Sequence, residues 1–190
     1  ISMMELPRLF KTEPTHDLQP DFRCWFDSDL GSYLLDAEAA LIARILPDLF
    51  GYHALQVGQM VGRNLLESSR IRHRCVVDVQ RPSVEGLSPL RAEPEKLPFA
   101  NNSLDLVFIH HGLDGASSPH AVLREASRVL IPEGHLLILG FNPWSIWGFW
   151  RLFRLPWAAL PWLRRPLSPQ RLADWLALLD FEVVGLESAC

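Results

Sequence analysis

Short apolar segments alternate along the chain with stretches of helical character, and this alternation constrains the fold more than any other feature. The clearest apolar segments are residues 53–57, 75–79, 104–109 and 136–139. Helices are predicted from apolar periodicity and from bounding prolines over residues 31–46, 119–129 and 169–179. Strands that alternate with helices form parallel sheets, so we expect a doubly wound, mostly parallel α/β sheet.

The segments between these elements carry weaker signals. We predict a short helix over residues 63–72 and a turn at residues 132–134. Residues 80–100 contain four prolines and are predicted to be loop and turn. Residues 136–139 have no polar side chain, which is typical of a strand at the centre of a parallel sheet. Residues 181–186 are predicted to begin a last strand.

Length and composition indicate one globular domain. The 190 residues suffice for a substantial core, and 48% of them are hydrophobic. We expect an N-terminal arm over residues 1–30, a domain over residues 31–190, and an insert rich in tryptophan over residues 143–166.

Charge, cysteines and hydropathy exclude several classes of protein. A net charge of -4 gives no support for a nucleic-acid partner. Cys24, Cys75 and Cys190 are widely spaced, which suits reduced thiols in the cytoplasm and gives no zinc pattern, so no metal is expected. No signal peptide is evident in residues 1–20, and no stretch reaches the ~18 apolar residues of a spanning helix.

Two passages in the second half of the chain carry a resemblance to a known family. The first is Glu93-Pro-Glu-Lys-Leu-Pro-Phe99 followed by Asn102-Ser-Leu-Asp-Leu-Val-Phe108, and the second is PHAVLREASRVLIPEG over residues 119–134. Both resemble passages of class I S-adenosylmethionine-dependent methyltransferases, in the type 11-like group that includes quinone-biosynthesis enzymes. The resemblance is strong over residues 90–142 and weaker back to residue 52. It implies a Rossmann-like methyltransferase sheet, whose final strand is expected to be absent from this chain.

The resemblance also implies where S-adenosylmethionine would bind. Ligands of such sheets lie at the carboxyl ends of the strands. The family's glycine loop matches Leu55-Gln-Val-Gly-Gln-Met-Val-Gly62, where Gln56 replaces the usual acid and only two glycines remain. The residues expected to bind the cofactor are Val57, Gly58, Gln59, Gly62, Asp78, Glu93 and His110. Asp78 matches the acid that binds the ribose, and Glu93 the acid that contacts adenine. Each of these positions also has a plain structural interpretation, as a turn, a cap or a surface carboxylate.

The histidines after the third predicted strand are candidates for contact with cofactor and substrate. We expect His110 beside the cofactor and His111 facing the substrate, where it would act as general base, because an imidazole pKa near ~6.5 suits that role. A hydrogen-bonded loop histidine is the alternative for either residue. Asp114 and Asn142 share this rim and could bind substrate or cap helices.

The tryptophan-rich insert has three interpretations. It contains five of the seven tryptophans and four arginines, with no acidic residue. It could form a lid over an apolar substrate, make peripheral contact with an anionic membrane, or pack within the protein or against a second copy in a homodimer.

Two functions follow from these observations. The first is an S-adenosylmethionine-dependent methyltransferase with an unknown small-molecule acceptor, for which an apolar molecule is one candidate. The alternative is a non-catalytic methyltransferase-like domain that acts as a binding or interaction module, which the reduced glycine loop favours. A nicotinamide dehydrogenase is a distant third, because G-x-G-x-x-G is absent.

Overall fold

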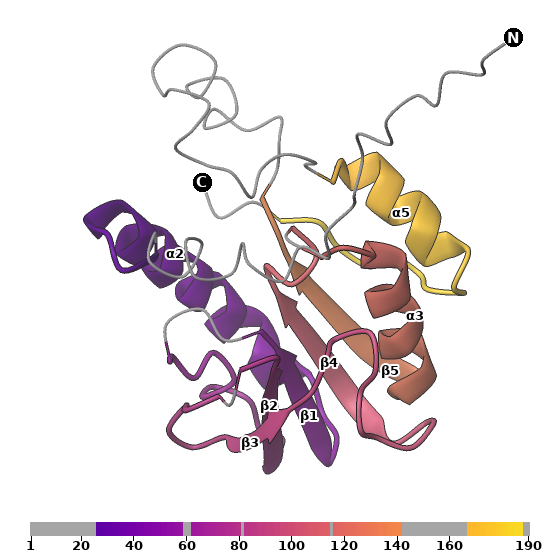
Figure 1. Cartoon of the computed structure of the whole chain (residues 1–190), viewed down its shortest axis with the longest axis horizontal. Helices are drawn as coiled ribbons and strands as arrows, with labels where there is room; N and C mark the ends of the chain where they lie inside the picture. The colour runs from indigo at the N-terminus through magenta and orange to yellow at the C-terminus, as the bar shows by residue number, and fades with distance from the viewer. Residues whose placement is uncertain (1–25, 59–61, 81, 115, 142–166, 188–190) are drawn as a thin grey trace, which may run out of the picture.

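A parallel β-sheet forms the centre of the protein, as the alternation of strands and helices predicts. The computed structural model describes residues 26–58, 62–80, 82–114, 116–141 and 167–187. In this part of the chain five strands stand in the order β3-β2-β1-β4-β5, and every pair is parallel (Figure 1). This confirms the expected fold class.

The strands form where apolar residues dominate, and they are most buried at the centre of the sheet. Their bounds are β1 His53–Val57, β2 His73–Asp78, β3 Ser88–Arg91, β4 Leu104–His110 and β5 Leu130–Leu139. In β1 the four residues after His53 are buried, and in β4 all except Asp105 are buried. β1 has the predicted bounds, and β4 is one residue longer than predicted.

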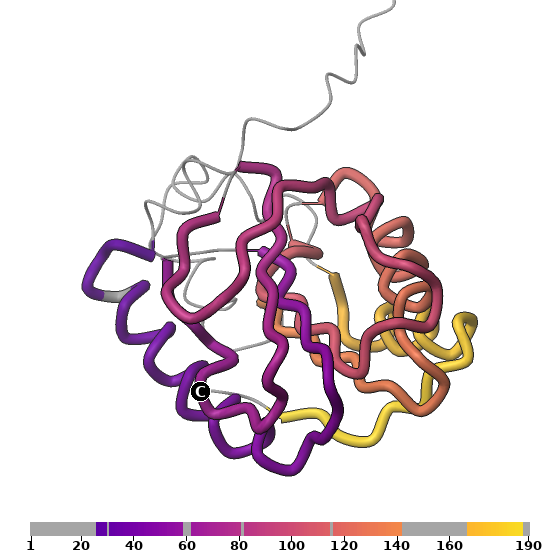
Figure 2. The backbone as a smooth tube through the Cα atoms, turned by 90° about the horizontal axis from the view of Figure 1, so that it is seen from below, coloured from indigo at the N-terminus to yellow at the C-terminus, as the bar shows by residue number. Residues whose placement is uncertain are grey.

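The helices lie on both faces of the sheet. Helix α2 spans Asp29–Ile45, where Ser28 caps its first turn, and the short 3-10 helix η2 (Leu46–Asp48) follows it. Helix α3 spans Pro119–Val129, as predicted, and α5 spans Pro169–Ala177. In Figure 2 α2 lies on one side of the sheet, and α3 and α5 lie on the other. No described helix has the length and apolar character needed to cross a membrane.

Each face of the sheet has its own hydrophobic core, because alternate residues of a strand point to opposite faces. Leu35 and Ile42 of α2 pack on the face that Ala54 and Phe108 line. On the other face, residues of α3 such as Leu123 pack against Leu55, Val107 and their neighbours. The carboxyl ends of the strands are therefore held from both sides.

The predicted helix over residues 63–72 is wrong. Residues 65–68 form turns, and Leu65 and Leu66 are buried; the Ser69 amide donates to the Leu66 carbonyl oxygen, which closes one turn that does not continue as a helix. The Asn64 side chain accepts a hydrogen bond from the Leu66 amide, and Arg74 of β2 donates to the carbonyl oxygens of Leu66 and Glu67. These side chains satisfy backbone groups that a helix would otherwise pair.

The prediction also failed at the edges of the sheet. β3 lies within the predicted loop of residues 80–100, where its Pro89 and exposed side chains hide the strand signal. Residues 136–139 were predicted to form a central strand, but they belong to β5, which is an edge strand of the described sheet, and they are only half-buried. The predicted turn at residues 132–134 is an irregularity inside β5, where Leu104 pairs with Leu130 but Leu106 pairs with His135.

The predicted last strand is also absent from the described residues. Residues 181–187 have no strand hydrogen bonds, and Val183, Val184 and Leu186 are exposed. An apolar segment becomes a strand only when a neighbouring strand accepts its backbone hydrogen bonds, and none is described beside this segment.

Candidate functional site

The point where the strand order reverses places β1 next to both β2 and β4. β1, β2 and β4 end at Val57, Asp78 and His110, and all three carboxyl ends meet at one edge of the sheet. Ligands of open α/β sheets bind at this kind of edge. The structure thus brings most of the candidate residues together there.

Gly58 makes the bend that follows β1, and the structure demands a glycine at this position. Its φ is +92°, and its amide donates a hydrogen bond of 2.9 Å to the carbonyl oxygen of Val77. A Cβ atom there would lie 2.9 Å from the carbonyl oxygen of His110. Both facts require a residue without a side chain, so the backbone bends tightly between β2 and β4.

Gln56 occupies the place of the acid that the family uses, and it is buried below this bend. Its Nε2 donates to the carbonyl oxygen of Gly58 at 3.1 Å. Its Oε1 is buried and has no hydrogen-bond partner among the described residues. A buried acceptor without a partner is costly, so this oxygen marks a place where a donor outside the described residues would be stabilising.

Asp78 and Glu93 differ in how the protein holds them. Asp78 ends β2, is 4% exposed, and accepts a hydrogen bond from the Gln80 amide. Glu93 is exposed and lies two residues after β3, whose Arg91 pairs in register with Asp78. Both acids therefore lie near the carboxyl edge. Among the other candidates, Val57 is buried in the core and Gly62 is exposed with a φ of +62°.

The loop that carries Glu93 is fastened to α3 by hydrogen bonds from two ion-paired residues of that helix. Arg128 donates to the carbonyl oxygens of Leu97 and Phe99 and also pairs with Glu125. Glu125 in turn accepts the Leu97 amide at 2.8 Å. The Arg128 hydrogen bond lowers the pKa of Glu125, which keeps this carboxylate charged. The two passages that carry the family resemblance are thus bound to each other.

A buried polar cluster joins β4 to α2 beside Gly58. Glu38 of α2 lies with its Oε2 3.1 Å from Nε2 of His110 and its Oε1 2.9 Å from Nε2 of His111. Asp114 lies with its Oδ2 2.9 Å from Nδ1 of His111, and this oxygen also accepts the Phe141 amide. The side chains of all four acidic and imidazole residues are no more than 6% exposed.

The ionisation of this cluster follows from its hydrogen bonds. Burial lowers the pKa of His110 to about 4, so this ring is neutral near pH 7. Burial also opposes a charge on His111, but hydrogen bonds to Asp114 and Glu38 outweigh it and raise its pKa to about 9. For Glu38 the penalty of burial is outweighed by the hydrogen bonds to both histidines, which lower its pKa to about 2. Near pH 7 a His111 cation lies between two carboxylates.

Three aromatic rings surround the two histidines. Phe26 lies 5.3 Å from the His111 ring and 6.1 Å from the His110 ring, Phe141 lies 4.4 Å from His111, and Phe108 lies 5.8 Å from His110. In this arrangement both ring nitrogens of His111 face carboxylates. Its predicted role as general base, which stays a prediction, would require one of these carboxylates to move away.

Glu38 was not among the residues predicted from the sequence. Its signal was available, because residues 35, 38 and 42 share one face of a helix and Leu35 and Ile42 are buried core residues. A carboxylate in the apolar stripe of a helix indicates a buried partner. Other candidates, namely Gln59, Asn142 and the whole insert of residues 143–166, lie outside the described residues.

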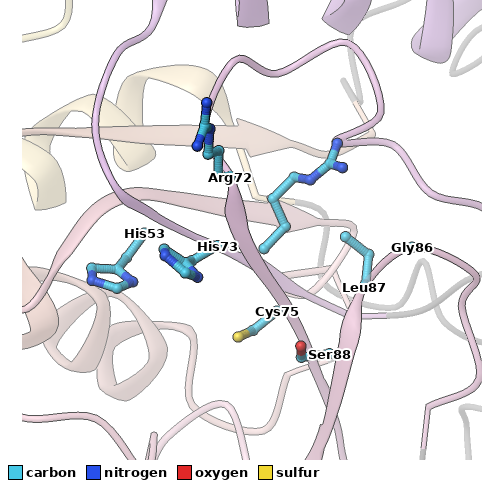
Figure 3. A pocket seen from close by; sticks show the side chains of 8 residues that line it. His53, Arg72, His73, Cys75, Gly86, Leu87 and Ser88 are labelled. Carbon is cyan, nitrogen blue, oxygen red and sulfur yellow. The ribbon is translucent and has the colours of Figure 1, made fainter.

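A surface hollow lies at the opposite end of the sheet. It has a volume of about 500 Å³ and is lined by His53, Arg72, His73, Arg74, Cys75, Gly86, Leu87 and Ser88 (Figure 3). His53, His73 and Ser88 begin β1, β2 and β3, so the hollow faces the amino ends of the strands. Because ligands of this architecture bind at the carboxyl ends, the edge near Gly58 is the stronger candidate.

Comparison with known proteins places this chain beside methyltransferases. Residues 55–138 match the family described as "Methyltransferase domain". The chain is 34% identical over 171 residues to the uncharacterized protein YafS of Escherichia coli (strain K12), which covers 90% of this chain and 69% of YafS.

Two further proteins are more distant. A ubiquinone/menaquinone biosynthesis C-methyltransferase UbiE of Bartonella tribocorum is 33% identical over 118 residues, which span 52% of this chain but only 45% of that enzyme. A crystal structure from Thermotoga maritima, described as a SAM-dependent methyltransferase and possible histamine N-methyltransferase, superposes with a TM-score of 0.65. It covers 87% of this chain and 82% of its own, and at 19% identity it supports the fold alone.

Proposed function

Because the chain belongs to the class I S-adenosylmethionine-dependent methyltransferases, we propose that it binds this cofactor at the carboxyl ends of β1 and β2 and methylates a small-molecule acceptor. The observation that carries the proposal is the Gly58 bend, which lies at the reversal of strand order and excludes any side chain. The bend lets a ligand approach the backbone closely.

The residues at this edge fit the two ends of S-adenosylmethionine. A carboxylate at the tip of β2 suits hydrogen bonds from a ribose diol, and Asp78 provides it. In this proposal Glu93, which is exposed on the loop that Arg128 holds, contacts the adenine. At the other end, Gln56 Oε1, which has no hydrogen-bond partner among the described residues, lies below the Gly58 bend and suits the methionine ammonium.

The protein's part in catalysis is to bind and orient. The chemistry that S-adenosylmethionine supplies when bound is a methyl group already activated on a sulfonium. A site for methyl transfer then has to align the acceptor and exclude water, which can supply most of the rate. In this proposal the Glu38–His111–Asp114 hydrogen bonds fix the end of β4, where the acceptor would meet the cofactor.

An apolar aromatic acceptor is the class that the comparisons favour. The UbiE relative is named for ubiquinone and menaquinone biosynthesis, and Phe26 and Phe141 line the region around His111. The insert of residues 143–166, with its tryptophans and arginines, supports a lid over such an acceptor. Contact with a membrane surface or a second copy of the chain is the alternative role for the insert.

Calorimetric titration with S-adenosylmethionine and S-adenosylhomocysteine tests the proposal. We expect both to bind the wild-type protein, and Asp78→Ala to weaken binding about 10- to 100-fold, because hydrogen bonds to a charged group contribute about 1.5–3 kcal/mol. Asp105→Asn is the matched control. Asp105 also accepts backbone amides, from Tyr52 and His53, but at the amino end of β4, so cofactor affinity should not change.

Two results would contradict the proposal. The absence of binding at millimolar ligand would favour the non-catalytic binding module. Equal affinities for wild type and Asp78→Ala would show that the cofactor lies elsewhere.

A further inference from the structure

Glu38, His110 and His111 bring three potential metal ligands together inside the protein. The Nε2 atoms of the two histidines face the two oxygens of one carboxylate, and the ligand atoms all lie within 4.8 Å of one another. All three residues are buried. We propose that these residues bind one divalent transition-metal ion of the first row, with Zn²⁺ as the representative ion.

The backbone at His111 takes a conformation that brings both rings to the same carboxylate. Consecutive side chains of a strand normally point to opposite faces. His111, directly after the end of β4, has a φ of +51°, which lies in the left-handed region that residues with a Cβ atom rarely adopt. Such strain costs about 1–3 kcal/mol, and it is found mostly at functional sites. The ring centroids of His110 and His111 consequently lie only 4.8 Å apart.

Asp114 supplies the support that metal-binding histidines usually have. A ligating histidine generally donates its other ring N–H to a carboxylate or carbonyl, which fixes the ring and its tautomer. Asp114 Oδ2 lies 2.9 Å from Nδ1 of His111, so this nitrogen keeps its proton when a metal ion binds, and Nε2, which faces Glu38, gives up its proton to become the ligand atom. Nδ1 of His110 has no such partner among the described residues, so His111 is the better oriented ligand.

The distances suit a metal ion after a small adjustment. With bonds of about 2.0–2.2 Å, neighbouring ligand atoms of a tetrahedral zinc site lie roughly 3.4 Å apart. The two Nε2–oxygen distances are 3.1 and 2.9 Å, a few tenths of an ångström below this separation, and the ligand atoms all lie within 4.8 Å of one another, so the widest pair would have to approach to close around one ion. The two carboxylates, Glu38 as ligand and Asp114 behind His111, balance the charge of a divalent ion.

The ligand types decide the class of ion. Two imidazoles and one carboxylate favour Zn²⁺, Fe²⁺, Co²⁺ or Ni²⁺, whereas Mg²⁺ and Ca²⁺ prefer oxygen ligands. Three protein ligands leave at least one position for water or another molecule, which is the arrangement of catalytic zinc sites. The proposal does not depend on methyl transfer, because metal binding can be measured without the cofactor.

The test uses the whole chain after treatment with a chelator and dialysis. We expect one Zn²⁺ per chain by calorimetry, and Co²⁺ should give the visible absorption of a four- or five-coordinate site. Glu38→Gln should weaken Zn²⁺ binding at least tenfold, and Asp114→Ala, which removes the support of His111, about 10- to 100-fold. A Zn²⁺-dependent rise in the melting temperature of the wild-type protein is the second measurement.

A second group of possible ligands provides the matched control. His53 and His73 stack with ring centroids 5.2 Å apart at the hollow that Cys75 also lines, at the other end of the sheet. The double variant His53→Ala/His73→Ala should keep the Zn²⁺ affinity of the wild type. Loss of binding in this variant, or equal affinity in Glu38→Gln, would overturn the proposal.

X-ray absorption of the zinc-loaded wild type decides the matter even if a variant fails to fold. Two imidazole nitrogens with oxygen ligands support the site. A sulfur ligand would indicate one of the three cysteines and overturn the proposal, as would the absence of stoichiometric binding by the wild type.

Discussion

Replacing Glu38 with alanine is expected to lower the free energy of unfolding by about 3–5 kcal/mol in the presence of a chelator. The change removes the carboxylate that both His110 and His111 face, at 3.1 and 2.9 Å, in a region that is almost fully buried. Breaking a buried ion pair by removing one partner typically costs about 3–5 kcal/mol. Asp114 stays beside Nδ1 of His111, but the Nε2 atoms of both histidines lose the carboxylate that they face. Total stability is typically only about 5–15 kcal/mol, so the effect will be large.

Urea denaturation followed by circular dichroism measures this loss. Asp36→Ala is the matched control, because Asp36 lies on the same helix two residues away but makes an exposed ion pair with Arg63. Exposed pairs contribute about 0–1 kcal/mol. A titration of the His111 ring by NMR should also show its pKa falling from about 9 when Glu38 is removed. If Glu38→Ala cost no more than Asp36→Ala, the inferred charged cluster would be refuted.

Three further outcomes are expected. The raised pKa of His111 gives stability that is present in full below pH 6.5 and is lost as pH rises through about 9. Between pH 7 and 10 the free energy of unfolding, measured by urea denaturation, should fall by roughly 2–3 kcal/mol in the wild type but not in His111→Asn. Gly58→Ala should lose about 1–2 kcal/mol for its backbone conformation, with a further loss from the contact with the His110 carbonyl oxygen and weaker cofactor binding by calorimetry. Gly86→Ala, with a φ of +79° but only the Asn64 side chain nearby, should lose the first contribution alone. Arg128→Ala should cost about 1.5–3 kcal/mol in urea denaturation and speed hydrogen exchange at the Leu97 amide; an unchanged exchange rate would contradict the proposed role of the ion pair.

Local sequence patterns predicted the centre of the sheet well, because there the periodicity and the tertiary environment agree. β1 and α3 have the predicted bounds, since each is a short element whose larger apolar residues enter the core. β3 was missed because an edge strand can carry Pro89 and exposed side chains. The prediction of a helix over residues 63–72 failed because Arg74, just beyond that segment, donates hydrogen bonds to the carbonyl oxygens of Leu66 and Glu67.

The sequence predicted those residues of the candidate site that lie at the ends of strands, but not the side-chain contacts between distant segments. Gly58 directly follows β1, and Asp78 and His110 end β2 and β4, so a rule based on strand ends located them without any knowledge of side-chain contacts. Glu38 contacts His110 although the two are 72 residues apart in the sequence, and no local sequence pattern predicts a contact over such a separation. The left-handed backbone conformation of His111 could not be predicted either, because a histidine in a sequence does not indicate a positive φ.

The role of the Arg128 ion pair has a consequence for other chains that share the passages of family resemblance. The passage that identifies the family joins a loop to a helix through Arg128, Glu125 and the backbone of Leu97 and Phe99. These contacts have a structural role, and they would be retained in a descendant that no longer bound any substrate. To find relatives that keep catalytic activity, one should therefore compare the bend after β1 and the carboxyl end of β2, because these positions would contact a ligand directly.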